Sequence, residues 1–296
     1  MPDITSSTLA PFIPTVIANT ALEILRNYIV IAPLVTRDSD IAAFNVGDTL
    51  NIPYPGTFVA NDKLANTVVT LQVPSATTTS VVLNKHKEAS FLLEDRGSAL
   101  ANQDVMARYA EAAVIPIAEQ IESDILALYS TFTNTTGVGG TNLNYATLVA
   151  TRKLMNDNKV SKANRYMVVS DKDEAAILSD STLIPYFQYG NTSSLVDGSL
   201  PSVAGFKLLP SQLVPFATNY KNLAFDPGAI ILATRGLPAA PAGSGANSSV
   251  VTDPVSGLTL RCTVAYNAQL LGVQVTLDVL YGVAKLRNEK AVVVLS

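Results

Sequence analysis

The stretch Gly47-Asp-Thr-Leu-Asn-Ile-Pro-Tyr54 opens a β-prone segment that continues to Leu93 and leads into a long helical segment. Within this stretch Leu50 and Ile52 alternate with polar neighbours, which is the two-residue period of a half-buried strand. The whole segment is polar, with a Pro/Ser/Thr-rich middle at 74–80, so it has no core of its own. A hairpin standing alone is marginal in water. The pattern therefore indicates that another copy of the chain supplies the missing surface, and it favours assembly over chemistry.

The β-prone segment predicts a long two-stranded hairpin. Pro53 and Pro55 cannot donate ladder hydrogen bonds, so the first strand should lie at a sheet edge. We expect the tip of this hairpin, near 55–67, to be disordered or variable in an isolated subunit. The apolar positions that predict the later strands are Val69, Leu71, Val73, Val81, Leu83, Ala89, Phe91 and Leu93.

A long helix is predicted from residue 103 to residue 129, roughly 40 Å in length at the usual helical rise. Its apolar residues recur three and four positions apart and form one stripe. Pro116 removes one hydrogen bond inside this helix and is expected to kink it. Ser98 or Asn102 is expected to cap its start. The stripe consists of Val114, Ile117, Ile121, Ile125 and Leu128.

Shorter elements are predicted on both sides of this region. Residues 16–31 are helical and form either a docking arm or a packed helix. Two further helices are expected at 145–156, with Leu148, Val149 and Leu154 facing inward, and at 171–178. Strands are expected at 165–170, 206–209, 229–233, 258–266, 273–279 and 292–295, and polar or mobile loops at 131–141, 190–198 and 236–249.

Composition narrows the class of function. The chain has 296 residues, enough for one large domain or two ordinary ones. Hydrophobic residues make up 48% and charged residues only 15%, which suits burial in many subunit contacts. The net charge of −4 leaves no basic excess, so tight electrostatic binding of DNA or RNA is disfavoured. The sequence shows neither a signal-peptide pattern nor an apolar run of membrane-spanning length, so no membrane partner is expected.

No catalytic, cofactor or metal motif is visible, so we predict a protein that is not an enzyme. His86 is the only histidine and has no second His or nearby Cys, which favours a structural role over a ligand or base. Cys262, the only cysteine, lies on the apolar face of its strand, where a buried inert thiol is expected. The carboxylates of the long helix favour a solvated or interface-facing flank over acid–base chemistry; they are Glu111, Glu119, Glu122 and Asp124.

The glycine-rich stretches carry no phosphate-binding motif. Gly137-Val-Gly-Gly140 and Gly243-Ser-Gly245 both lack a downstream Lys-Ser/Thr pair. Asn-x-Ser/Thr matches at Asn134, Asn191 and Asn247 are read as chance, because no secretion signal accompanies them. A single cysteine also excludes an intramolecular disulfide and suits a reducing cytoplasm.

Several motifs nevertheless occur in a characteristic order. They are Asn45-Val-Gly-Asp-Thr-Leu-Asn-Ile-Pro53, Lys85-His-Lys-Glu-Ala-Ser-Phe91 with Glu94-Asp95, the helical stretch 112–128, Arg165-Tyr-Met-Val-Val-Ser170, Gly198-Ser-Leu-Pro-Ser-Val-Ala-Gly-Phe206, and Tyr281-Gly-Val-Ala-Lys-Leu-Arg287. This order, spread over nearly the whole chain, resembles the major capsid proteins of tailed double-stranded-DNA bacteriophages, closest to the podovirus coat-protein branch.

The resemblance implies an α+β subunit with the tailed-phage major-capsid fold. Its parts would be an N-terminal arm at 1–46, an extended β-hairpin loop with its strands at 47–93, and the long spine helix of the peripheral domain at 94–141. The axial domain would occupy 142–235, and 236–296 would hold a loop and C-terminal strands that return to both domains. The podovirus prototype carries an inserted β-domain, so a cut-down insertion or none is expected near 131–141 or 236–252.

The resemblance also implies partners and a location. Identical subunits would form hexamers and pentamers of an icosahedral shell that encloses a double-stranded DNA genome without sequence-specific binding. A scaffolding protein, a portal and a decoration protein are the further partners, and the virion, assembled in the host cytoplasm, is the location. Lys63 is the only lysine placed for an isopeptide weld of the kind some relatives form, and no partner asparagine is identifiable.

Three alternatives stay open from sequence. A cellular nanocompartment shell shares this fold but packages protein cargo. A tail-tube or other virion β-protein would not need the long helix. An enzyme is the third alternative, and a single histidine without a motif argues against it.

Overall fold

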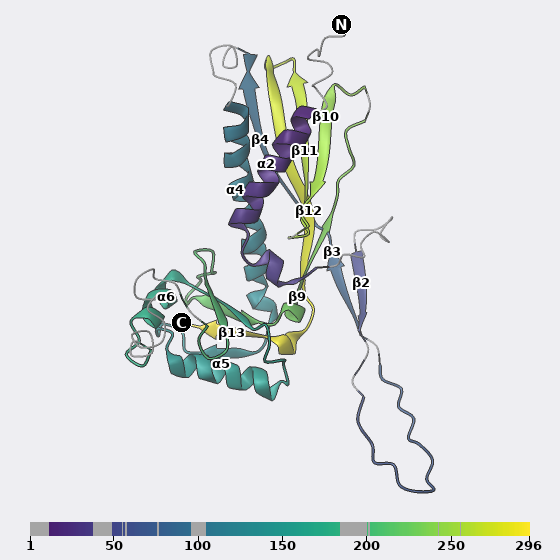
Figure 1. The fold of residues 1–296 in the computed structure, drawn as a ribbon, viewed down its shortest axis with the longest axis vertical. Coiled ribbons are helices and arrows are strands. Elements are labelled where there is room, and N and C mark those ends of the chain that lie inside the picture. The colour runs from purple at the N-terminus through teal and green to yellow at the C-terminus, as the bar shows by residue number, and fades with distance from the viewer. Residues whose placement is uncertain are drawn as a thin grey trace.

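The computed structural model describes residues 12–37, 49–54, 56, 58–75, 77–95, 105–183, 200, 202–241, 243–254 and 256–296. It is an α+β structure, as predicted, with a six-stranded sheet, a five-stranded sheet and a two-stranded sheet. The larger sheet and two helices form an elongated upper body, the five-stranded sheet lies below it, and a loop projects away from both (Figure 1). The predicted cap residues Ser98 and Asn102, the tip residue Pro55 and the loop 190–198 lie outside the described residues.

The six-stranded sheet is organised around one long strand, β12 (Gly272–Lys285). This strand pairs antiparallel with β11 and β4 over its first part and with β9 over its last part. Its odd-numbered residues from Val275 to Tyr281 face the core and are fully buried, as period-two alternation requires. The other strands of this sheet are β1 (Thr36–Arg37), β4 (Lys85–Glu94), β9 (Ile230–Arg235), β10 (Ala246–Thr252) and β11 (Thr259–Asn267).

Two helices cover one face of this sheet. Helix α4 (Val105–Leu126) is the predicted long helix, and it continues into a 3-10 helix, η3 (Ala127–Thr131). The predicted stripe is confirmed, because Val114, Ile121 and Ile125 have no exposed surface. Pro116 lies inside the helix; the kink it would cause stays a prediction. With 22 residues, α4 is about 33 Å long.

The N-terminal helix is a packed helix rather than a free docking arm. Helix α2 (Phe12–Tyr28) lies against α4 and against strands β10 and β11. Its side chains Ala18, Ala21 and Leu25 are fully buried in the main hydrophobic cluster. The small alanines on this face let the two helices approach closely. Helix α2 therefore covers the side of the hydrophobic core that α4 and the sheet leave open.

The five-stranded sheet has its own core and two helices. Helices α5 (Tyr145–Asp157) and α6 (Asp171–Leu178) match the predicted ones, and the Asn144 and Ser170 side chains cap them by accepting from the amides of Thr147 and Asp173. The strands, in spatial order, are β5 (Thr135–Gly137), β13 (Ala291–Leu295), β8 (Lys221–Phe225), β6 (Tyr166–Val169) and β7 (Lys207–Pro210).

Several sequence predictions are wrong in detail. Residues 69–73 alternate but form no strand. The segment 85–94 belongs to the main sheet and not to the arm, because β12 supplies its ladder partner. Residues 246–249, predicted as part of a mobile loop, begin β10 and pair with β11. Val149, predicted to face inward on its helix, is 41% exposed, while Met155 fills the buried position.

Two segments were candidates for an inserted domain. Residues 131–141 contain only the short strand β5, which pairs with β13. Residues 236–252 contain strand β10. Within their described residues neither segment forms a separate β-domain.

Candidate assembly surface

The projecting loop grows from a two-stranded root. Strands β2 (Thr49–Tyr54) and β3 (Thr77–Val82) pair antiparallel, with Leu50 opposite Val81. Among the described strands β2 has β3 as its sole partner, so the edge position predicted from its prolines is confirmed. The root is not coreless, which corrects the expectation from sequence. Leu50, Val81 and Leu83 are buried against Ile231 and Ala233 of β9.

The root also crosses the long strand at a position that needs glycine. A side chain at Gly282 of β12 would collide with the backbone carbonyl of Val82 and crowd Leu83. The absence of a Cβ at Gly282 lets the end of β3 lie directly on the sheet. The base of the hairpin is therefore tied closely to the body.

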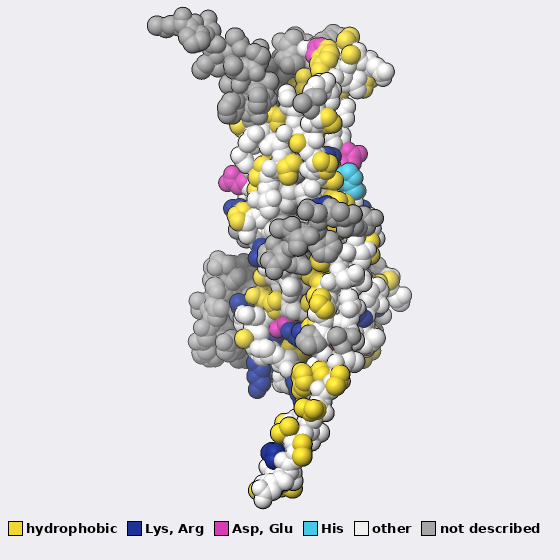
Figure 2. Space-filling model, turned by 90° about the vertical axis from the view of Figure 1, so that its right-hand side faces the viewer, with side chains coloured by type: hydrophobic (Ala, Val, Ile, Leu, Met, Phe, Trp, Pro, Cys, Tyr) yellow, Lys and Arg dark blue, Asp and Glu magenta, His cyan; other side chains and the backbone are white. Residues whose placement is uncertain are grey.

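Beyond the root, the loop exposes an apolar row. Val68, Leu71 and Val73 are 90%, 88% and 96% exposed, far more than ordinary surface residues of this type. Figure 2 shows yellow side chains along the loop that projects below the body. Contiguous exposed apolar side chains on a protein surface mark a contact site. The other large apolar side chains exposed here are Phe58, Val59, Leu64 and Val69.

The two limbs of the loop are held together by a side-chain amide. Gln72 Nε2 donates to the carbonyl of Val59 at 2.5 Å, and the amide of Val59 donates to Gln72 Oε1 at 2.9 Å. The Gln72 side chain thus replaces a ladder partner that the backbone does not provide. Near the tip, Lys63 Nζ donates to the carbonyl of Leu64 at 2.8 Å and to the hydroxyl of Thr67. The apolar row is therefore presented on a closed loop.

The prediction that the carboxylates of α4 lie on a solvated or interface-facing flank is wrong for two of the four. Glu111 and Glu119 are exposed, as expected. Asp124 instead accepts from the Tyr281 hydroxyl at 2.6 Å and pairs with Lys85 Nζ at 3.0 Å. Burial, with this hydrogen bond to Asp124, raises the pKa of Tyr281. Asp124 therefore ties the helix to β12 and to the first residue of β4.

Glu122 is buried and joins the two helices. Its Oε1 accepts from the backbone amides of Val30 and Ile31, just beyond the end of α2. Burial raises the pKa of Glu122, while these backbone hydrogen bonds oppose the shift. The carboxylate satisfies amides that would otherwise be orphaned in the core. Its role is structural, and the signal that identifies it is its position on the buried side of the helix.

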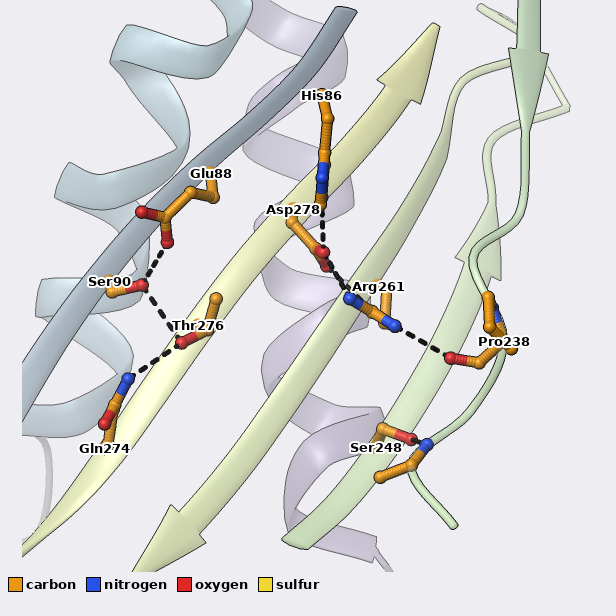
Figure 3. Close-up of polar contacts among 10 residues, drawn as sticks. His86, Glu88, Ser90, Pro238, Ser248, Arg261, Gln274, Thr276 and Asp278 are labelled. Atoms are coloured by element: carbon orange, nitrogen blue, oxygen red, sulfur yellow. Dashed lines mark hydrogen bonds and ion pairs between the residues drawn. The ribbon is translucent and has the colours of Figure 1, made fainter. Parts of the chain in front are cut away.

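The face of the large sheet opposite the helices is polar (Figure 3). Arg261 forms a two-pronged contact with Asp278, at 3.0 Å and 2.5 Å, and donates to the carbonyl of Pro238. His86 Nε2 lies 2.9 Å from Asp278 Oδ2, so His86 does have a partner, 192 positions away in the chain. The Arg261–Asp278 hydrogen bond raises the pKa of Arg261. These contacts join β4, β12 and β11 and support the structural role predicted for His86.

No described group suggests redox or metal chemistry. Cys262 is fully buried, as predicted, and burial raises the pKa of its thiol to about 12, which keeps it protonated and unreactive. Among the described residues, no cluster of three or more His, Cys, Asp or Glu side chains could hold a metal ion. None of the helices in the described ranges has the length and apolar character needed to cross a bilayer.

Comparisons with known proteins agree with this architecture. Residues 127–237 match the phage capsid protein family. A solved chain of Mycobacterium phage Che8 has a TM-score of 0.65 at 17% identity, covering 90% of each chain. The capsid structure of cyanophage P-SCSP1u gives a TM-score of 0.68 at 13% identity, with 90% of this chain and 88% of that chain covered. A search of curated protein sequences finds no match.

The likeness extends to a virus-like particle from Pyrococcus furiosus, with a TM-score of 0.54 at 10% identity, covering 95% of this chain and 98% of that chain. The fold is thus that of tailed-phage major capsid proteins, and the predicted resemblance is confirmed at this level. The match of 127–237 to the phage capsid protein family points to the same class of proteins as the fold does. The podovirus branch is not singled out by these comparisons.

Proposed function

We propose that this chain is the major capsid subunit that self-assembles into an icosahedral shell around a double-stranded DNA genome. The observation that carries the proposal is the apolar row Val68, Leu71 and Val73 on a loop that the subunit itself leaves uncovered. In a chain with a capsid-shell fold, the natural cover for this row is an identical neighbour. Burying one such side chain contributes ~1.5–3 kcal/mol, so the row favours association strongly.

Assembly through this loop is cooperative. Each subunit donates one loop and receives another, so contacts of moderate strength add up when a ring of subunits closes. The loop would lie across the helical face of the neighbour, over its α4. Hexamers and pentamers of identical subunits are the arrangement that closes an icosahedral shell.

The charge balance supports a container for DNA. With a net charge of −4, the subunit has no basic excess that would hold packaged DNA by sequence-independent attraction. Packing and release would both be opposed by a wall that bound DNA tightly. A portal, a scaffolding protein and a decoration protein complete the proposed set of partners, and the virion, assembled in the host cytoplasm, is the proposed location.

A shell that encloses protein cargo is the main alternative. The fold alone does not separate the two, because the likeness includes the virus-like particle from Pyrococcus furiosus as well as phage capsids. The family match of 127–237 favours the phage function. A tail tube is disfavoured because the structural match to a phage capsid covers 90% of the chain.

Electron microscopy of the full chain tests the proposal directly. Closed icosahedral shells are the expected product, either spontaneously or with the scaffold expressed from the same genome. Tubes or persistent monomers would overturn it. Particles taken from an infected host should contain nuclease-protected DNA, and particles that contain a defined protein cargo in place of DNA would establish the compartment alternative.

A further inference from the structure

A short strap connects the two large sheets and passes beside the root of the loop. It runs from the end of β12, at Lys285, to the start of β13, at Ala291, and includes the 3-10 helix η5 (Asn288–Lys290). The amides of Leu286 and Arg287 both donate to the carbonyl of Ala229. The strap is thus held at Ala229 where it leaves β12. Further along, Asn288 accepts from the amide of Thr133 and Lys290 pairs with Asp226 before the strap enters the five-stranded sheet.

Arg287 reaches from this strap to the loop root. Its guanidinium carbon lies 3.7 Å from the centre of the Tyr54 ring, well inside the range of a cation–π contact. Among the described residues no carboxylate pairs with Arg287. The Tyr54 hydroxyl is buried and has no hydrogen-bond partner there either. The ring face, and not the hydroxyl, is therefore what Arg287 uses.

The contact sits where the loop leaves the body. Tyr54 is the last residue of β2 and pairs with Thr77, the first residue of β3. Beyond this pair, the hydrogen bonds found for the described residues 58–75 stay within the loop, as the Val59–Gln72 and Lys63–Leu64 pairs do. Figure 1 shows the loop extending away from the sheets below this point. A contact at Tyr54 therefore influences the direction in which the loop leaves its root.

We propose that Arg287 is a positioning residue that aims the extended loop and couples its direction to the five-stranded sheet. The inference rests on the proposed function, in which the loop docks on a neighbour. A displacement of the five-stranded sheet against the six-stranded one pulls on the strap, and Arg287 then slides off the Tyr54 ring. The attraction fades beyond about 6 Å, so a small displacement releases the loop from its direction.

The test is a distance measurement between nitroxide labels on the full chain. One label is placed on the loop by Asn61→Cys and one on the five-stranded-sheet side by Lys153→Cys; both positions are exposed. Cys262 is buried and its thiol pKa is about 12, so labelling is confined to the introduced cysteines. The measurement is made on free subunits and on shells that contain a trace of labelled chain.

The expected result is a distance distribution at least about two-fold wider for Arg287→Leu and for Tyr54→Leu, because both remove the cation–π contact. Tyr54→Phe should match the parent chain, since it retains the ring. Glu289→Gln, an exposed strap residue without contact to the root, is the matched control. Unchanged widths in both leucine variants, or a broad distribution for Tyr54→Phe, would overturn the proposal. Tyr54→Leu, which removes the contact and leaves the strap unchanged, covers the case in which Arg287→Leu does not fold.

The two proposals fail in different ways. If the parent chain forms no shells, the proposed function is lost, while the label distances in free subunits still test Arg287. If shells form and the leucine variants keep the parent distribution, the positioning role is lost and the capsid function stands.

Discussion

The Tyr281 hydroxyl donates a 2.6 Å hydrogen bond to Asp124 Oδ2, linking the centre of the large sheet to the C-terminal turn of the long helix. The two residues are 157 positions apart in the chain. Lys85, at the start of β4, completes the group through Asp124 Oδ1. Helix α4 and two neighbouring strands of the large sheet, β12 and β4, therefore meet at one carboxylate.

Removing this carboxylate should destabilise the subunit. We expect Asp124→Ala to lower the free energy of unfolding by about 2–4 kcal/mol, because it leaves the buried Tyr281 hydroxyl without an acceptor and Lys85 without its partner. Asp124→Asn keeps an acceptor and should cost less. Urea unfolding followed by circular dichroism measures the change. Glu119→Ala, at an exposed position on the same helix, is the control and should stay within about 0.5 kcal/mol; equal losses for Glu119 and Asp124 would contradict the assignment.

Charge on the apolar row of the loop should block assembly without unfolding the subunit. Leu71→Asp and Val73→Asp place a carboxylate where an apolar contact is expected, and each should lower the subunit association constant at least about tenfold, the equivalent of ~1.4 kcal/mol. Light scattering and sedimentation measure shell yield. Thr70→Asp carries the same charge at the neighbouring exposed position and should still assemble. Normal shells from Leu71→Asp would show that the row is not at a contact.

Glu122 should give the subunit a distinct pH dependence. Burial raises its pKa in the folded state above the ordinary value of 4.5, so the folded chain holds a proton more tightly than the unfolded chain does. The resulting stability is fully present below pH 4.5 and is lost as the pH rises through the raised folded pKa. Glu122→Gln removes this titration. The difference in unfolding free energy between the parent chain and Glu122→Gln should therefore shift in favour of the parent as the pH falls from neutral towards 4.5. A difference that is constant with pH would contradict the prediction.

A methyl group at Gly282 should disturb the loop root. Gly282→Ala drives its Cβ into the carbonyl of Val82, so β3 must lift away from β12, and we expect a loss of about 1–3 kcal/mol. Gly236→Ala is the matched control, because its nearest neighbours are side-chain methyl groups of Thr259 and Val250 and not backbone atoms. Thermal unfolding compares the two. Should Gly282→Ala melt at the same temperature as the parent chain, the close crossing of β3 over β12 would not stand.

Periodic patterns predicted the helices and the C-terminal strands well. The α4 stripe and the alternation in β11 and β12 are long enough to reveal their period from local sequence alone. Strand β8 was missed because it is a short run buried on both faces, without alternation. The alternation at 69–73 was misread for the opposite reason: a strand also requires a partner, and the subunit provides none there.

The polar contacts were beyond the reach of local sequence. Asp124 and Glu122 lie two positions apart on one helix, but their partners come from β12, β4 and the turn after α2. His86 seemed to lack a partner because Asp278 is far along the chain. Arg287 and Tyr54 meet only because the strap passes the root. Such pairs follow from topology, which a single sequence does not contain.

The length of β12 has a mechanical consequence. One strand of 14 residues is bonded to β4 on one side and to β11 and then β9 on the other, so tension along it loads many ladder hydrogen bonds at the same time. The two-stranded root has six paired positions and one ladder. In a shell under internal pressure, the six-stranded sheet would therefore resist deformation. The two-stranded loop roots would deform first.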